Sequence, residues 1–304
     1  MSEKFHIISD GSCDLPPELA QEKNITVVPF YVCFSDDKYY KEIEEMPIRQ
    51  FYQHMVDIPK DYPKSSMPST QDYIDCFTPF VEDGMPILCI CITTKFSGSY
   101  QSALNAKEMI LEEHPGAVIE VMDSTINTVL QGNFVLEAVT LRDAGWSLSD
   151  SLRRLNEIKG SGRIFFTVGG IEHLKKNGRI GKVAVVATSA LNIRPIITLK
   201  EGEIFASGIS RGRAKSIEKS RLLLVDYLKE RNADVKDYSF DIGYGYDREE
   251  ALSWRGDIIK MLAENGYTLT EDDLPLYQIG AGIGVHTGPF PLGVTVIEKA
   301  LSSV

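Results

Sequence analysis

The chain has 304 residues, of which 43% are hydrophobic and 25% are charged, and its formal net charge is −11. This composition is typical of a soluble globular protein, and the length suits two domains of ordinary size. The acidic balance argues against nucleic-acid binding and against binding to an anionic membrane surface. No apolar run reaches the roughly 20 residues of a membrane span, and the N-terminus lacks the layout of a signal peptide. We therefore expect a cytoplasmic protein without stable membrane insertion.

The first half of the chain alternates between strand-like and helix-like patterns. Short apolar or β-branched runs predict strands, and apolar residues at helical spacing predict helices. This alternation is typical of a parallel sheet with helices packed on it. The expected strands are 5–9, 25–33, 87–92 and 118–122, and the expected helices are 16–23, 46–56, 71–82, 99–113 and 127–143.

The second half has a different pattern, with a hairpin around Glu201-Gly202 among strand and helix segments. It predicts a mixed sheet with helices on one face. We therefore expect an α/β chain with an N-terminal three-layer domain at 1–155, a C-terminal two-layer domain at 156–304, and a ligand between them. The expected strands are 163–168, 194–199, 203–208, 238–244, 276–279 and 294–297, and the helices are 148–159, 171–176, 214–229 and 249–264.

The cysteines and histidines show no spacing typical of a metal site. The five cysteines include no C-x-x-C pair, and Cys89 and Cys91 share one face of a buried-looking strand. Small buried side chains are the favoured interpretation of these cysteines. The five histidines are scattered and include no H-E-x-x-H motif. We expect neither a metal nor a cofactor.

Hydroxyl and carboxyl side chains gather where several predicted strands end, which is where ligands collect in parallel sheets. Ser97 in particular could cap the helix that follows it, leaving the amides of Gly98 and Ser99 near the positive helix end. Hydroxyls and free amides there suit a carboxylate or a phosphate. Ordinary helix capping is the alternative for each cluster taken singly. The clusters are 10–14, 65–70, 93–99 and 123–128.

The motifs of several enzyme classes are missing from the sequence. There is no P-loop and no G-x-G-x-x-G fingerprint. The segment "GAGIG" at 280–284 is flanked by a strand and His286 rather than opening a helix, so we interpret it as a site of close backbone packing. His286 lies between glycines and could hydrogen-bond a carboxylate or act as a base, or it could be a structural histidine.

Six motifs together resemble the DegV family, in family order from residue 7 to residue 293. "FSGSYQSA", preceded by Thr93-Thr94, is similar to the family's S-S-x-L-S-G-T-Y-Q-S-A signature. The others are "IISDGSCDLP", "SSMPS", "VMDST", "NGRIGK" and "GVHTGPFPLG". This chain departs from the family pattern at Met67, where Gln is usual, and at Phe290-Pro291, where a small pair is usual.

The resemblance implies a two-domain fatty-acid-binding protein that serves as the carrier subunit of a bacterial fatty acid kinase. The kinase partner would phosphorylate the bound carboxylate to an acyl-phosphate for phospholipid synthesis, and the carrier itself would have no enzymatic activity. By the same resemblance, the arginines that would face the kinase are Arg179, Arg211 and Arg213. The residues expected to bind the carboxylate are Ser65, Ser66, Thr93, Thr94, Ser97, Gly98 and His286.

An alternative from another class is a phosphotransferase subunit for a small carbonyl or sugar-like substrate. It would use Ser97 and His286, because the architecture also resembles dihydroxyacetone kinase subunits, in which a histidine holds a carbonyl substrate. The missing nucleotide loop and the missing partner for a base weigh against it. A fatty acid that co-purifies with the protein would favour the carrier, and a small polar ligand would favour the alternative.

Overall fold

The computed structural model describes residues 5–186 and 193–301. Its N-terminal part contains a four-stranded parallel sheet with the strand order β2-β1-β6-β7. Every neighbouring pair of these strands runs parallel, as the alternation of strands and helices predicts. Strand β6 is fully buried, in keeping with its uninterrupted apolar sequence. The strands are β1 (His6–Asp10), β2 (Ile25–Val28), β6 (Ile87–Cys91) and β7 (Ile119–Asp123).

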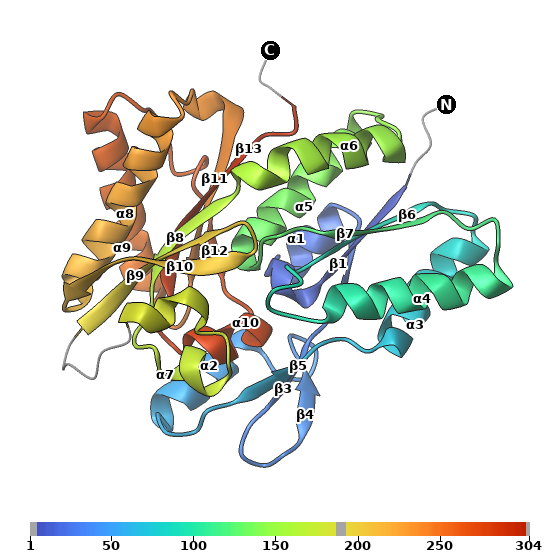
Figure 1. Ribbon diagram of the computed structural model, residues 1–304, viewed down its shortest axis with the longest axis horizontal. Helices are drawn as coiled ribbons and strands as arrows, with labels where there is room; N and C mark the ends of the chain where they lie inside the picture. Colours follow the sequence, from blue (N-terminus) through green and yellow to red (C-terminus); the bar gives the residue numbers. More distant parts are fainter. Residues whose placement is uncertain (1–4, 187–192, 302–304) are drawn as a thin grey trace.

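Helices cover both faces of this sheet, which makes the N-terminal part three-layered (Figure 1). Helices α3 (Thr70–Glu82) and α4 (Ser99–Glu113) pack on one face through one hydrophobic cluster. On the other face lie α1 (Pro17–Glu22), α5 (Thr128–Asp143) and α6 (Leu148–Ile158). A capping box formed by Ser69 and Asp72 begins α3.

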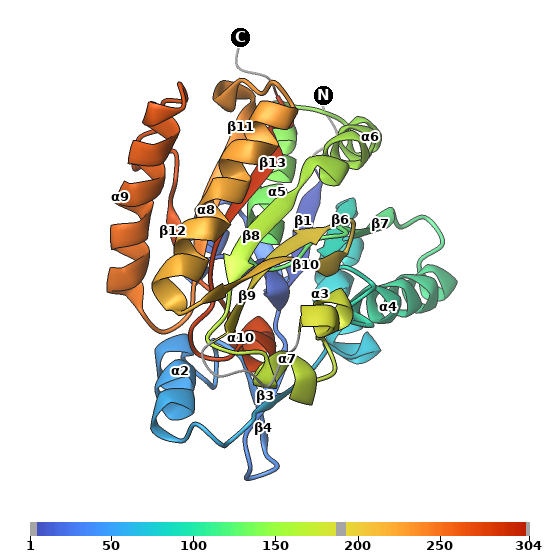
Figure 2. The same cartoon turned by 60° about the vertical axis from the view of Figure 1, so that its left-hand side comes forward.

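The C-terminal part contains a six-stranded mixed sheet with the order β10-β9-β8-β13-β11-β12. Its β11–β12 pair is parallel, and its other pairs are antiparallel. Helices α8 (Arg213–Glu230) and α9 (Arg248–Glu264) cover one face, as Figure 2 shows. The strands are β8 (Arg163–Thr167), β9 (Ile193–Lys200), β10 (Glu203–Arg211), β11 (Tyr238–Tyr244), β12 (Leu276–Gln278) and β13 (Leu292–Glu298).

The second face of the mixed sheet packs toward α5, so the two halves share one hydrophobic cluster. Ile164 and Leu199 of the mixed sheet belong to the same cluster as Ile7 and Leu88 of the parallel sheet. The predicted two-layer arrangement of the C-terminal half is confirmed. The boundary predicted between residues 155 and 156 falls inside α6 and stays a prediction.

A third, small antiparallel sheet with the order β4-β3-β5 lies at the foot of the molecule in Figure 1. The prediction of one strand over 25–33 is wrong, because the chain divides at Pro29-Phe30 into β2 of the parallel sheet and β3 of this small sheet. Proline lacks the backbone N–H that a continuous ladder would need. The elements here are β3 (Tyr31–Cys33), β4 (Tyr39–Lys41), α2 (Ile48–Asp57) and β5 (Lys64–Ser66).

A short C-terminal helix, α10 (Ala281–Thr287), packs against this N-terminal segment. The interpretation that "GAGIG" does not open a helix is therefore wrong. Within 5–186 and 193–301, no helix has both the length and the hydropathy to cross a membrane. The remaining elements are α7 (Glu172–Lys176) and 3-10 turns at Gly11–Cys13, Lys159–Ser161, Gly181–Val186 and Val235–Asp237.

Candidate functional site

A cavity of about 300 Å³ lies where β5, the β6–α4 loop and α10 meet the segment that follows α7. Its wall is polar on one side and apolar on the other. The polar side includes five of the seven residues expected to bind a carboxylate: Ser65, Ser66, Ser97, Gly98 and His286. The apolar side is formed by Phe30, Ile92, Phe96, Phe166, Leu174, Ile204 and Ile283.

The corner between β6 and α4 is fixed by the buried carboxylate of Asp10 at the end of β1. Asp10 accepts hydrogen bonds from the Ile92 amide at 2.9 Å and from the Ser99 hydroxyl at 2.7 Å. Asp10 thereby links the end of β6 to the start of α4. Burial raises the pKa of Asp10, and these donors oppose that shift.

Helix α4 begins at Ser99 with Gly98 as its N-cap residue, so the predicted capping role of Ser97 is wrong in position. Ser97 lies one residue earlier, and its hydroxyl oxygen still accepts a hydrogen bond from the Ser99 amide at 3.2 Å. The hydroxyl hydrogen of Ser97 therefore remains available for a ligand in the cavity.

His286 lies in the last turn of α10 with its ring beside Ser65. The Nε2 atom is 3.2 Å from the Ser65 hydroxyl oxygen. The Nδ1 atom is buried and has no hydrogen-bond partner among the described residues. Burial, together with the positive charge of Arg179 and the nearby His173, lowers the pKa of His286 to about 4. The imidazole is therefore neutral near pH 7 and carries one N–H donor.

The buried carboxylate of Glu42 holds the start of α10 in place. It accepts hydrogen bonds from the amides of Phe30 at 3.0 Å and Gly282 at 2.7 Å, which are far apart in the sequence. A Cβ atom at Gly284 would lie 2.7 Å from a ring carbon of Phe51, so glycine is needed for this approach. The predicted close packing of "GAGIG" is thus confirmed. The role of Glu42 was missed, because nothing in the sequence distinguishes it from the neighbouring Glu44 and Glu45.

The hydroxyls of Thr93 and Thr94, two residues expected at the carboxylate, point to other partners. Thr93 is buried and donates to the carbonyl of Gly202, in the turn between β9 and β10, at 3.2 Å. Thr94 is exposed and donates to a carboxylate oxygen of Asp123 at 2.8 Å. Neither residue lines the cavity. Thr93 instead fastens the hairpin of the C-terminal half to the corner of the N-terminal half.

The three arginines predicted to dock a partner have different surroundings. Arg179 is exposed at the cavity, where its Nε donates to the Phe96 carbonyl at 3.1 Å. Arg211 is exposed at the end of β10. Arg213 is engaged within the protein, because it forms a two-pronged ion pair with Glu250 and donates to the Phe290 carbonyl at 2.9 Å.

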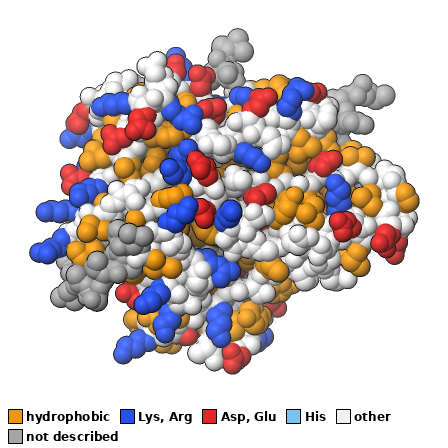
Figure 3. Space-filling view, viewed as in Figure 1, with side chains coloured by type: hydrophobic (Ala, Val, Ile, Leu, Met, Phe, Trp, Pro, Cys, Tyr) orange, Lys and Arg blue, Asp and Glu red, His pale blue; other side chains and the backbone are white. Residues whose placement is uncertain are grey.

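Figure 3 shows Lys and Arg side chains spread over the face that carries α7 and the β9–β10 hairpin, interspersed with hydrophobic side chains. The ring of Phe290 meets that of Tyr246 edge-on, with 6.1 Å between the ring centroids. It does not line the 300 Å³ cavity. The unusual Phe290 of this chain therefore packs beside the cavity without narrowing its polar end.

A smaller cavity of about 50 Å³ adjoins the first, between the mixed sheet, the start of α5 and α10. It shares Asn127, Phe166, Ile204, Ile283 and Thr287 with the first cavity. Beyond them, its wall consists mainly of aliphatic side chains and glycines. The two cavities together lead from the hydroxyl-rich corner into the apolar interior, past the N-terminus of α5. The further wall residues include Val129, Ile164, Leu199, Gly243, Ile279 and Leu292.

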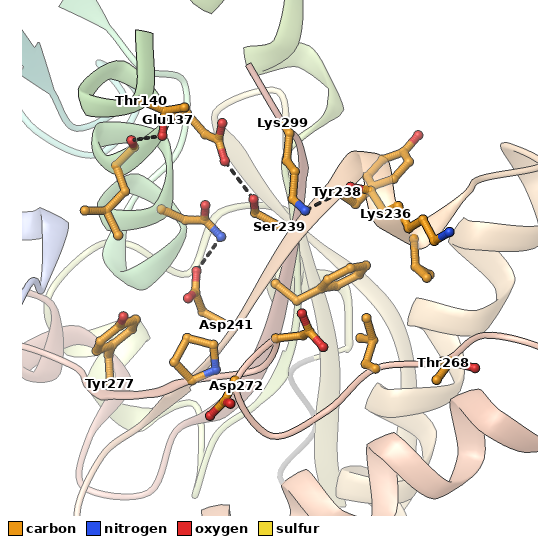
Figure 4. A pocket seen from close by; sticks show the side chains of 17 residues that line it. Glu137, Thr140, Lys236, Tyr238, Ser239, Asp241, Thr268, Asp272, Tyr277 and Lys299 are labelled. Atoms are coloured by element: carbon orange, nitrogen blue, oxygen red, sulfur yellow. Dashed lines mark hydrogen bonds between the residues drawn. The ribbon is translucent and has the colours of Figure 1, made fainter. Parts of the chain in front are cut away.

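A separate open groove of about 460 Å³ runs between α5 and the β11–β12 side of the mixed sheet (Figure 4). Its inner carboxylates pair with neighbours across the two halves. Asp241 accepts from the Asn133 amide at 2.6 Å, and Glu137 accepts from the Ser239 hydroxyl at 2.7 Å. Burial raises the pKa of Asp241 to about 7. These pairs give the groove a structural role in joining the halves, so the candidate ligand site is the hydroxyl-rich cavity.

Comparison with known proteins agrees with this arrangement. A family model described as an uncharacterised protein of the DegV family matches residues 4–299. The chain belongs to the DegV family. The resemblance inferred from the six motifs is thereby confirmed. A DegV domain-containing protein of Clostridium perfringens is 28% identical over 294 residues, which are 97% of this chain and 99% of that protein.

Solved structures of other DegV proteins have the same α/β fold. A stearic-acid-binding protein from Eubacterium ventriosum is 40% identical, with a TM-score of 0.91 over 97% of this chain and 99% of that one. A fatty-acid-binding DegV protein from Thermus thermophilus is 28% identical, with a TM-score of 0.84 over 97% and 99% of the two chains. The predicted fold, a parallel sheet followed by a mixed sheet, is confirmed.

Proposed function

We propose that this DegV protein carries a long-chain fatty acid between its two sheets. The observation that carries the proposal is the pair of adjoining cavities, polar at the β6–α4 corner and apolar in the interior. The stearic acid bound by the relative from Eubacterium ventriosum has the same division into a polar head and an apolar chain. No catalytic activity is assigned to the chain itself.

The carboxylate would lie among Ser65, Ser97 and His286, with Ser66 and the Gly98 amide beside them. Hydroxyls, a neutral imidazole N–H and the start of α4 all offer hydrogen-bond donors or positive partial charge. The acyl chain would leave water for the apolar walls, at about 0.8 kcal/mol for each buried CH₂. This division supports a fatty acid over a small polar substrate, which would leave the apolar walls unused.

We further propose that a partner fatty acid kinase phosphorylates the bound carboxylate to an acyl-phosphate, which feeds phospholipid synthesis. The exposed Arg179 lines the same cavity as the residues proposed to bind the carboxylate. A guanidinium there could pair with phosphate or with acidic side chains of the partner. Because the partner would use ATP, the proposal also places the protein in the cytoplasm.

Native mass spectrometry and organic extraction of the purified protein test the carrier proposal. We expect a near-stoichiometric long-chain fatty acid, and we expect a delipidated sample to take up stearic acid. A delipidated protein that binds a small polar carbonyl compound and takes up no fatty acid would contradict the proposal. Adding the kinase and ATP to the loaded carrier should then yield acyl-phosphate, which neither protein produces alone.

A further inference from the structure

Asn127 lies directly before α5, at a position where its side chain would ordinarily cap the helix. It is the N-cap residue, with an extended backbone at φ −157° and ψ 179°, yet its side chain makes no capping hydrogen bond. Asparagine is favoured at this position because its side-chain oxygen usually accepts an amide of the first turn. The Asn127 side chain is therefore used for something else.

That side chain lies in the wall shared by the two cavities of the proposed acyl channel. Its Oδ1 atom is buried and has no hydrogen-bond partner among the described residues. The neighbours that line both cavities with it are mostly apolar, namely Phe166, Ile204 and Ile283. A buried acceptor without a donor is costly in such surroundings.

Two hydroxyls that line these cavities have partners other than this oxygen. Thr128, which lines the deeper cavity, donates to Asp14 at 2.5 Å. Thr287, which lines both cavities, donates to the Gly288 carbonyl at 3.4 Å. A ligand that fills the channel can supply the donor that the described residues do not give to Asn127.

We propose that the ligand of this chain is a hydroxylated long-chain fatty acid whose hydroxyl hydrogen-bonds the Asn127 amide. This inference rests on the fatty-acid-carrier function proposed above. A saturated, unsubstituted chain would cover the Asn127 oxygen with CH₂ groups and leave it without a donor. A hydroxyl both donates and accepts, so it suits either end of the amide group.

The hydroxyl lies along the acyl chain, away from the carboxyl carbon. Ser65, Ser97 and His286 line the outer cavity and not the deeper one, whereas Asn127 lines both. With the carboxylate at the outer residues, the part of the chain that passes Asn127 is the part that enters the deeper cavity. A mid-chain hydroxyl therefore fits this position, and a hydroxyl beside the carboxylate does not.

The test is a set of binding titrations on the delipidated full chain. The probes are stearic acid and hydroxystearic acids with the hydroxyl on carbon two, ten or twelve. We expect one mid-chain isomer to bind about three- to tenfold more tightly than stearic acid, the range for one added neutral hydrogen bond. The isomer with the hydroxyl on carbon two should show no such gain.

Two variants separate the hydrogen bond from general packing. Asn127→Leu has a similar size and should bind stearic acid at least as well as the wild type while losing the preference for the mid-chain isomer. Ile283→Val alters an apolar neighbour in the same wall and should keep the preference. Asn127→Ala replaces Asn127→Leu if the leucine variant does not fold.

Each outcome has a definite meaning. Stearic acid binding as tightly as every hydroxylated isomer, or Asn127→Leu keeping the preference, would overturn the inference and leave the carrier function standing. A delipidated wild type that binds none of these acids would contradict the carrier function and the inference with it.

Discussion

The polar side chains that line the cavity differ in which of their donors and acceptors are already used within the protein. The Ser97 oxygen already accepts from the Ser99 amide, so its hydrogen is free to donate to a ligand. His286 is neutral because burial lowers its pKa to about 4, and Ser65 lies 3.2 Å from its Nε2 atom. Such a corner can meet a carboxylate with two or three neutral donors, and the Arg179 side chain lines the same cavity.

At the same scale, Ser97→Ala and His286→Ala should each weaken fatty-acid binding. A hydrogen bond to a charged group is worth roughly 1.5–3 kcal/mol, so we expect a loss of about tenfold or more. Calorimetry or a fluorescent fatty acid would measure it. Thr94→Ala is the matched control, because the Thr94 hydroxyl pairs with Asp123 outside the cavity.

A second ligand sharpens that comparison. The methyl ester of the same fatty acid lacks the negative charge and should bind more weakly than the free acid. Its affinity should therefore change less than that of the free acid in both variants. Affinity for the free acid that stays at the wild-type value in both Ser97→Ala and His286→Ala would rule out the assigned carboxylate site.

Among the elements, α10 packs closely against its neighbours at its glycines. It carries His286, and the amide of Gly282 in its first turn donates to the buried Glu42. A Cβ atom at Gly284 would meet Phe51 at 2.7 Å and the Tyr52 hydroxyl at 2.9 Å, both on fully buried rings of α2. The position of the imidazole therefore depends on the close contacts that Gly282 and Gly284 make.

Gly284→Ala should destabilise the protein by about 1–3 kcal/mol, because buried rings must shift to admit a methyl group. It should also weaken fatty-acid binding through the displaced His286. Gly256→Ala is the matched control: Gly256 is exposed in α9, and a Cβ atom there meets nothing within 4 Å. In a helix interior this change should add about 0.5–1 kcal/mol of stability. Equal urea midpoints for the two variants would contradict the packing argument.

On the scale of the whole molecule, buried carboxylates join the two halves. Asp241 of β11 accepts from Asn133 of α5, and Glu137 of α5 accepts from Ser239 of β11 and from the Ala300 amide. Burial raises the pKa of Asp241 from 3.8 to about 7. The folded chain therefore holds a proton on Asp241 across a pH range in which the unfolded chain has lost it.

This difference sets the sign of a pH dependence. The contribution of Asp241 to folding stability is complete below pH 3.8 and is lost as the pH rises through about 7. Between those limits the loss approaches about 1.4 kcal/mol per pH unit. We expect Asp241→Asn, which keeps an acceptor for Asn133 and cannot ionise, to flatten this dependence. Urea unfolding at pH 5 and pH 8 measures how much the free energy of unfolding changes between these pH values. An identical change in wild type and variant would refute the explanation.

The surface arginines give a further prediction for the molecule with its proposed partner. Arg179→Ala and Arg211→Ala should leave fatty-acid content unchanged and lower acyl-phosphate formation in the presence of kinase and ATP. Arg213 also stays in the predicted docking set, but its pairing with Glu250 means that Arg213→Ala should lower stability as well. Full kinase-dependent turnover in all three variants would remove the docking role and leave the carrier proposal untouched.

The sequence by itself determined the family, the order of most strands and helices, and the cluster of hydroxyls at the end of β6. These features rest on local patterns: apolar runs, helical spacing, and motifs whose residues are neighbours in the chain. The break at Pro29-Phe30 also has a local cause, since proline cannot continue the hydrogen bonding of a strand. The β-branched and aromatic residues around it favoured the prediction of a single strand.

Only the tertiary structure decided which of the clustered residues meet. Ser65 and His286 are 221 residues apart, and they come within hydrogen-bonding distance because α10 packs on the small N-terminal sheet. The hydroxyl of Thr93 donates to the Gly202 carbonyl because the β9–β10 hairpin of the other half lies beside it. Glu42 likewise contacts backbone amides that are distant in the sequence, and Asn127 lies in a cavity wall formed by residues that are distant in the sequence. Hydrogen bonds and burial depend on distances in space, and a pattern along the chain does not record them.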